Sequence, residues 1–324
     1  MEFTNDLRRL LNPAPDERAA LDGECAARLW GALLDGALDD IEVGAMIAAL
    51  AVGGEDVAAL LGLHRALHER IARVNVADSG VIAIPAYGLF EGEAHLVALA
   101  AMLLRRFDLR VVVHGVLDAP CGTSCTRILR ELDVLPSPTL LHAERHLADD
   151  GIAFVPVSLL SPAFARVLAL RSRLGIENSA HVVAQLLDPT QGGALRLAMN
   201  VGGPRGARLD ALLDSLDGDV LALHWSSDRG APNLALRPRI DRVRDGAAEA
   251  LFEADGLDLR TPNLPPGDDI AAFAAWIRAV CHGGATAPVP ALNLVAACLY
   301  AVGRAPDFAR AKAITAVHAG RLAA

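Results

Sequence analysis

Two short apolar segments separated by a helical stretch constrain the fold of this chain more than any other feature. Residues 81–84 and 109–113 are apolar runs of the length of buried strands, and apolar residues recur at helical spacing over 94–107 between them. Strand, helix and strand in this order form a βαβ unit, whose strands lie parallel in one sheet. The sequence therefore predicts an α/β fold with a mostly parallel sheet.

The chain divides into two parts by its pattern. Residues 1–76 show helical spacing without a strand pattern and are expected to form a helical N-terminal domain. Residues 77–324 are expected to form a larger α/β domain around a mostly parallel central sheet. Its further strands are expected at 153–157, 195–201 and 220–224, with helices at 126–132 and 207–216 between them and a helical tail from residue 268.

Charge and composition exclude several classes of protein. The net charge is −9, which argues against nucleic acid binding over the whole surface but allows a local arginine-lined groove. Lys312 is the only lysine, so a phosphate would have to be held by arginines or backbone N–H groups. The cysteines are scattered, the first residues lack the layout of a signal peptide, and no apolar stretch is long enough to span a membrane. We therefore expect a cytoplasmic protein with no membrane partner.

Ligand-binding residues are expected in the loops that follow the strands, because parallel sheets bind ligands at the carboxyl ends of their strands. The first such loop, 85–92, supplies Tyr87 and Gly88 as candidates. Its two glycines do not have the arrangement of a phosphate cradle, and Glu91 would repel a diphosphate. An ordinary turn is therefore the alternative interpretation.

The second loop combines His114 and Gly115 with Thr123 and Ser124, which precede a helix. Backbone N–H and hydroxyl groups at the N-terminus of a helix can hold an anion. The alternative is a helix cap without a ligand.

No metal and no cofactor is expected. Cys121 and Cys125, with His114 or His142 added, lack the second matched pair of ligands that zinc sites have. The adjacent carboxylates at 16–17 lie in the N-terminal segment, where they are badly placed to hold magnesium at the edge of the sheet.

Two polar clusters lie farther along the chain. Arg171, Asn178 and His181 interrupt an apolar helical region and could face a cleft, although His181 could equally be a buried histidine with its hydrogen bonds satisfied. The second cluster is rich in arginine and could contact the phosphates of a nucleic acid, or could be a solvated connection from a strand to a helix. Its members are Arg229, Arg237, Arg239, Arg242 and Arg244.

Taken together, these segments resemble the anthranilate phosphoribosyltransferase family (glycosyltransferase family 3) over nearly the whole chain. The family's fold is nucleoside phosphorylase/phosphoribosyltransferase-like, and the resemblance implies that helices around 160–188 join the N-terminal domain in space. The shared order of short motifs carries the resemblance: 29–36 and 44–61 are similar to the family's N-terminal helices, 114–115 to its Lys-His-Gly-Asn-Arg segment, 128–134 to its Asp-Val-Leu-Glu-Ala-Leu-Gly segment, and 171–175 and 186–189 to its Arg-x-x-Leu-Gly and Gly-Pro-Leu-x-Asn-Pro segments.

The departures from the family concern its chemistry. Residues 86–91 replace the Gly-Thr-Gly-Gly-Asp loop that cradles the diphosphate, and Val113 stands where the family has lysine. The family's magnesium-binding Asp-Glu pair is missing from the corresponding region, 225–229. Diphosphate departure from ribose needs its charge to be neutralised by a metal and cations. The family's standard reaction is therefore not expected.

One branch of the family, the YbiB-like proteins, resembles this chain further at 114–117, 174–181 and 187–189. Membership implies a homodimer, formed through the N-terminal helices, that binds DNA or RNA without sequence preference through a basic groove. The branch's Arg-x-Lys-Gly-Glu stretch, however, reads Ala-Val-Gly-Gly-Glu at 51–55.

Three hypotheses about function follow. The first is a non-catalytic homodimer that binds nucleic acid. The second is a phosphoribosyl or glycosyl transferase with an altered substrate and a remodelled phosphate site. The third is a small-molecule sensor that uses a cleft at Tyr87, His114 and His181.

Overall fold

Seven strands form one sheet at the centre of the computed structural model, which describes residues 2–12, 22–53, 56–76, 80–119, 122–175, 177–225, 234–254 and 264–322. The order across the sheet is β3-β2-β1-β4-β5-β6-β7. The parallel part consists of β1 (Ile82–Ala86), β2 (Val111–Gly115), β3 (Ile152–Pro156), β4 (Leu195–Asn200) and β5 (Asp219–His224), and β6 (Arg239–Arg244) and β7 (Ala247–Phe252) add an antiparallel edge. The expected α/β fold with a mostly parallel sheet is confirmed.

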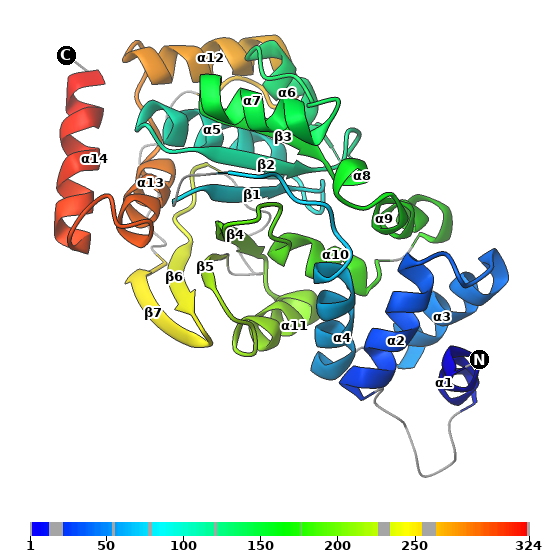
Figure 1. The fold of residues 1–324 in the computed structure, drawn as a ribbon. Helices are drawn as coiled ribbons and strands as arrows, with labels where there is room; N and C mark the ends of the chain where they lie inside the picture. The colour runs from blue at the N-terminus through cyan, green and yellow to red at the C-terminus, as the bar shows by residue number, and fades with distance from the viewer. Residues whose placement is uncertain are drawn as a thin grey trace.

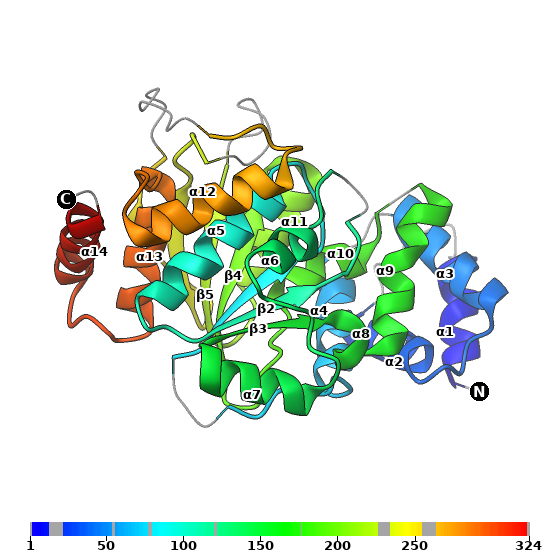
Figure 2. The same cartoon turned by 90° about the horizontal axis from the view of Figure 1, so that it is seen from above.

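Helices cover both faces of the sheet (Figures 1 and 2). One face packs against α5 (Glu93–Arg106), α6 (Cys125–Glu131), α12 (Ile270–His282) and α13 (Val289–Ala301), with α14 (Phe308–Leu322) outside α13. The other face packs against α7 (Leu140–Asp150), α10 (Ser179–Val183), the short 3₁₀ helix η1 (Ala184–Leu186) and α11 (Gly203–Leu213). Among the described helices, none is both long and apolar enough to cross a membrane.

The two faces of the sheet differ in the size of their side chains. In β1, Ile82 and Ile84 point toward α5, whereas Ala83 points to the opposite face. Small side chains let a helix come close to a sheet, and η1 contacts β1 and β4 directly on this second face. The alternation continues across the sheet, with Val113, Phe154, Leu197 and Leu221 on the α5 face and Ala153, Ala198 and Ala222 on the other.

A group of helices lies at one end of the sheet, at the right of Figure 1. It contains α1 (Glu2–Leu11), α2 (Gly23–Leu34), α3 (Asp40–Gly53) and α4 (Val57–His68), and the helices α8 (Val157–Leu160) and α9 (Pro162–Leu174) lie beside them. Helix α9 contacts α2, and α10 contacts α4. The division into domains at residues 76 and 77 stays a prediction.

The helical spacing that the sequence shows up to residue 76 is not helix to its end, because α4 ends at His68. Beyond it the backbone bonds to other segments of the chain. The N–H of Ala72 donates to the carbonyl oxygen of Leu160, and that of Val74 donates to the carbonyl oxygen of Pro189, at 2.8 Å each. These contacts tie the connection between the helical end and the sheet in place.

The arginine-rich segment is a strand of a hairpin and not a connection to a helix. Strand β6 pairs with β5 on one side and with β7 on the other, both antiparallel. Asp245 and Gly246 join β6 to β7, with φ angles of 49° and 77°. Two consecutive residues at positive φ form the tight turn that an Asp-Gly pair favours, so the signal for this hairpin is present in the sequence.

Replacing Gly62 by alanine should lower the free energy of unfolding by about 1–3 kcal/mol, because the core there has no room for a methyl group. A Cβ at this position would lie 2.6 Å from the Cβ of Ala26 and 2.7 Å from the backbone nitrogen of Ala27 in α2. Gly44→Ala is the matched control, since no described atom lies within 4 Å of its Cβ and alanine favours a helix by about 1 kcal/mol over glycine. Urea denaturation followed by circular dichroism measures both variants, and equal stabilities would contradict the close packing of α2 on α4.

Candidate functional site

The strand order reverses between β1 and β4, and the region outside the carboxyl ends of these strands is called the crevice. From β1 the chain continues through α5 to β2 on one side, whereas β4 and β5 lie on the other side of β1. Ligands bind at such a point of reversal in open parallel sheets, outside the carboxyl ends of the strands. The loops after β1, β2 and β4 are therefore the candidate functional site.

A buried carboxylate occupies the loop after β1. Glu93, the first residue of α5, accepts the backbone N–H groups of Tyr87 and Gly88 on Oε1, at 2.6 and 2.8 Å, and that of Leu89 on Oε2, at 2.7 Å. Gly88 has a φ of 63°, which lets consecutive N–H groups turn toward the same point. Converging N–H groups of this kind form a nest that binds an anion, and here the anion belongs to the chain itself.

The surroundings of Glu93 act on its charge in opposite directions. Burial raises the pKa of the Glu93 carboxyl, and the hydrogen bonds from the three N–H groups and the nearby guanidinium of Arg205 oppose that rise. The side chain is 3% exposed. An incoming diphosphate would have to displace this carboxyl group to reach the N–H groups of the loop.

Tyr87 and His114 are brought together but are buried. The Tyr87 hydroxyl lies 2.9 Å from Nδ1 of His114, and the two rings meet edge to face at 5.6 Å. No described residue offers a partner to Nε2 of His114, and burial lowers the pKa of this histidine to about 3. The imidazole is therefore neutral near pH 7 and cannot balance the charge of a phosphate.

Gly115 is required by the close approach of two strands. A Cβ on Gly115 would lie 1.8 Å from the carbonyl oxygen of Ala86 at the end of β1. The glycine therefore serves the packing of β2 on β1, and its position after His114 does not by itself mark a ligand.

The hydroxyl groups of the loop before α6 donate hydrogen bonds to backbone carbonyl groups. Thr123 donates to the carbonyl oxygen of Gly267 at 3.3 Å, and Ser124 donates to that of Leu117 at 2.8 Å. Burial raises the pKa of the Cys125 thiol, and Cys121 lies outside the described residues. Within the described part of the chain, no three His, Cys, Asp or Glu side chains gather in a way that could hold a metal ion.

Glu177 pairs with two arginines of the crevice. Its carboxylate lies 3.1 Å from Nη2 of Arg171 and 2.8 Å from Nη1 of Arg205. The Arg205 guanidinium also lies over the ring of Phe90, 5.9 Å from its centroid, which links α11 to the loop after β1. Glu177 thus offsets part of the positive charge of Arg171 and Arg205 inside the protein.

Asn178 and His181 cap the N-terminus of α10. The Asn178 side chain accepts the N–H of Ala180 at 3.0 Å, and Nδ1 of His181 accepts the N–H of Asn178 at 3.2 Å. Both residues are buried, and burial lowers the pKa of His181 to about 4. Their polar groups therefore support the short helix that follows the crevice.

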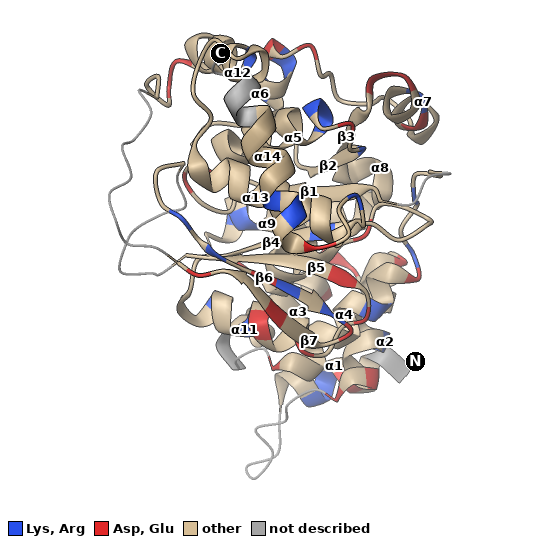
Figure 3. Cartoon of the chain, turned by 90° about the vertical axis from the view of Figure 1, so that its left-hand side faces the viewer, with Lys and Arg blue, Asp and Glu red and all other residues tan. Residues whose placement is uncertain are grey.

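The arginines of β6 are matched by carboxylates. Asp241 lies 2.8 Å from Nε of Arg239, and Asp219 lies 2.5 Å from Nη2 of Arg242 and 3.0 Å from Nη2 of Arg244. Figure 3 shows basic and acidic residues beside one another on this hairpin. Arg237 lies just before β6 and is half-buried, and the expected contact residue Arg229 lies outside the described residues. Asp241 and Asp219 therefore offset part of the positive charge of the three β6 arginines.

The sequence interpretation missed Glu93, Glu177 and Arg205. A carboxylate in the first turn of a helix is a common partner for N-terminal N–H groups, so Glu93 carried a local signal. Glu91, which was expected to repel a diphosphate, is exposed, and the buried carboxyl group of this region is that of Glu93. The pairing of Glu177 with Arg205 joins residues far apart in sequence and had no such signal.

No family model matches the chain. In sequence, it is 30% identical over 292 residues to the uncharacterized protein YbiB of Escherichia coli K12, covering 88% of this chain and 90% of YbiB. It is 31% identical over 192 residues to the anthranilate phosphoribosyltransferase of Methanothermobacter thermautotrophicus, covering 57% of this chain and 53% of that enzyme. In structure, it matches the anthranilate phosphoribosyltransferase (TrpD) of Thermus thermophilus with a TM-score of 0.73 and 20% identity, covering 96% of this chain and 93% of that one.

Proposed function

Because the chain belongs to the anthranilate phosphoribosyltransferase-like family that includes YbiB, we propose that it is a non-catalytic member that binds nucleic acid as a homodimer. The observation that carries the loss of catalysis is the Glu93 carboxyl group in the loop after β1. It takes the N–H groups of residues 87–89, which stand where the family's diphosphate cradle is expected.

Several other groups at the crevice support the loss of phosphoribosyl transfer. Transfer requires positive charge where the diphosphate leaves. His114 is neutral, Arg171 and Arg205 are paired with Glu177, and the only lysine of the chain is Lys312 in α14. The alternative, a transferase with an altered substrate, requires Glu93 to leave its three N–H partners.

Phosphoribosyl diphosphate at ~5 mM with Mg²⁺ should leave the melting temperature of the chain unchanged, because a ligand raises that temperature only by binding the folded state. Differential scanning fluorimetry measures the effect, with a catalytically active anthranilate phosphoribosyltransferase tested in parallel as the positive control. A rise that requires both the sugar phosphate and the metal would support the transferase alternative and sink the present proposal.

The surface of α3 supports a homodimer formed through the N-terminal helices. A helix that is apolar all round is normally buried, and α3 has apolar residues on every side. It lies at the outer edge of the helical group, where Ile41 is 81% exposed and Ala48 and Ala51 are also exposed. A second copy of the chain would cover this surface.

Ile41→Asp should convert the homodimer into a monomer, because it replaces the most exposed large apolar side chain of α3 by a charge. Light scattering should then give one protomer of 34.0 kDa in place of a particle of twice that mass. Leu141→Asp is the control, since Leu141 is also an exposed apolar side chain of the same size, at 54%, but lies on α7. A wild-type monomer, or a variant that stays dimeric, would contradict the proposed interface.

The exposed guanidinium groups of β6 support phosphate contacts of modest strength. The side chains of Arg239 and Arg244 are 44% and 62% exposed, whereas Arg242 is 11% exposed and held by Asp219. Carboxylates beside these arginines reduce the attraction for a polyanion. Binding is therefore expected to be weak and to depend on the phosphates more than on the bases.

The logarithm of the affinity for duplex DNA should fall with the logarithm of the salt concentration with a slope of about −2, since roughly two phosphates would be neutralised. Fluorescence anisotropy at low salt measures the affinity, and the double variant Arg239→Ala, Arg244→Ala should flatten the slope. Replacing Arg8 and Arg9 of α1 by alanine is the control for the same loss of charge elsewhere. Absence of binding, or affinity independent of salt, would rule out this part of the proposal.

The described cysteines support the proposed cytoplasmic location. Cys25, Cys125, Cys281 and Cys298 are buried free thiols. Proteins of oxidising compartments commonly pair their cysteines, whereas cytosolic proteins keep them reduced.

A further inference from the structure

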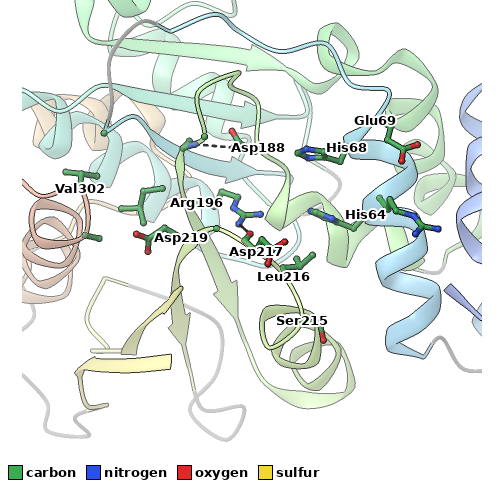
Figure 4. Close-up of a pocket in the computed structure, with 17 residues that line it drawn as sticks. His64, His68, Glu69, Asp188, Arg196, Ser215, Leu216, Asp217, Asp219 and Val302 are labelled. Carbon is green, nitrogen blue, oxygen red and sulfur yellow. Dashed lines mark hydrogen bonds between the residues drawn. The ribbon is translucent and has the colours of Figure 1, made fainter. Parts of the chain in front are cut away.

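A second hollow lies at the opposite edge of the sheet, at the amino ends of β4 and β5. It has a volume of about 670 Å³ and lies between these strand ends and the last two turns of α4 (Figure 4). The size is that of a site for a small molecule. Nothing in the crevice at the carboxyl ends of the strands contributes to it, so it is independent of the function proposed above.

Arg196, the second residue of β4, places a buried cation in this cavity. Arg196 is 6% exposed, and its guanidinium points toward His64 and Asp217 in Figure 4. Nη1 donates to the carbonyl oxygen of Leu186 at 3.2 Å, and Nη2 donates to that of Asp217 at 2.6 Å. A guanidinium has five N–H groups, so donors remain for a further acceptor.

The described residues supply no carboxylate to pair with Arg196. No ion pair among the described residues includes the Arg196 guanidinium. Burial lowers the pKa of Arg196, and the charges of Asp188, Asp219 and Asp217 oppose that shift without forming an ion pair with it. A buried charge that is not directly paired is costly. An acidic group of a ligand, binding through two parallel N–H···O bonds, would complete the site.

Two of the carboxylates that line the cavity already have hydrogen-bond or ion-pair partners within the protein. Asp188 accepts the N–H and hydroxyl of Thr190, at 2.9 and 2.8 Å, and the N–H of Ala194 at 3.1 Å. Asp219 is held by the arginines of β6. Asp217 differs, because its side chain is exposed and has no partner among the described residues.

The histidines and the apolar residues fill in the remaining walls. His64 and His68 stack with their ring centroids 6.0 Å apart, and burial lowers the pKa of His64 to about 4, so its ring is uncharged near pH 7. Leu216 and Val302 supply apolar surface. The exposed side chains of Arg65 and Glu69, at the end of α4, line the cavity as well. The cavity thus has one buried positive pole at Arg196 and one available negative pole at Asp217.

We infer that this cavity binds a small zwitterion of the amino-acid type, with its carboxylate on Arg196 and its ammonium group facing Asp217. The carboxylates around the cavity disfavour a phosphate dianion, and the single buried guanidinium disfavours a simple amine. The apolar and imidazole walls favour an uncharged side chain on the ligand, such as that of leucine or phenylalanine.

Calorimetric titration of the full chain with L-leucine and L-phenylalanine tests the inference. Two analogues each remove one pole of phenylalanine: 3-phenylpropionate lacks the ammonium group, and 2-phenylethylamine lacks the carboxylate. At least one of the amino acids should bind, and both analogues should bind at least tenfold more weakly than phenylalanine or not at all. No binding of either amino acid at ~10 mM, or equal binding of an analogue, overturns the inference.

Two variants assign the poles. Arg196→Gln should weaken amino-acid binding at least tenfold. The same arginine also donates hydrogen bonds to the carbonyl oxygens of residues 186 and 217, so circular dichroism must show that the variant folds. Asp217→Asn changes an exposed side chain without a partner among the described residues and should weaken amino-acid binding about tenfold while leaving 3-phenylpropionate unaffected. Asp214→Asn is the matched control, because Asp214 is equally exposed and does not line the cavity. If Asp217→Asn and Asp214→Asn behave alike, the inference fails even where Arg196→Gln cannot be purified.

Discussion

The hydrogen bonds between Glu93 and the loop after β1 determine what the crevice of this protein can do. Three consecutive N–H groups end on one buried carboxyl group, at 2.6 to 2.8 Å. A buried N–H without a partner destabilises a protein by about 1–3 kcal/mol, so the loop keeps its shape only while that carboxyl group stays. The backbone N–H groups of the loop can therefore bind an anion, and the carboxyl group of Glu93 already accepts them. In this chain the N–H groups of the loop position the first turn of α5.

The same internal pairing recurs at described arginines of the crevice and of the β5–β6 edge of the sheet. Glu177 holds Arg171 and Arg205, and Asp219 holds Arg242 and Arg244. None of these pairs contributes to the apolar core between the sheet and its helices. This separation allows the fold to match an anthranilate phosphoribosyltransferase while the polar groups of the two sites differ from those expected for the family.

The parallel strands and most helices could be predicted because their signals are local. Apolar runs and helical spacing follow from which side of an element is buried, and they placed β1 to β5 within a few residues. The β6–β7 hairpin was missed because three of the six residues of β6 are arginines and the segment resembles a surface patch, although Asp245 and Gly246 marked the turn. The candidate residues Tyr87 and His114 do meet, but the sequence could not show that they are buried. The roles of Glu93 and Arg196 depend on where a backbone turns and on which carboxylates come near, and neither is encoded in spacing.

The unequal faces of the sheet set different rules for substitution on its two sides. On the α5 face, where Leu197 and Leu221 lie, exchanging one large apolar side chain for another of similar volume costs less than about 1.5 kcal/mol. On the opposite face, Ala153, Ala198 and Ala222 act as spacers of fixed thickness, and each added methyl group would push a helix outward. The helix displaced first beside β4 would be η1, whose last residue gives its carbonyl oxygen to Arg196. Substitutions on the α5 face are therefore tolerated more readily than those on the opposite face. The small residues of that opposite face fix the distance between the sheet and its helices.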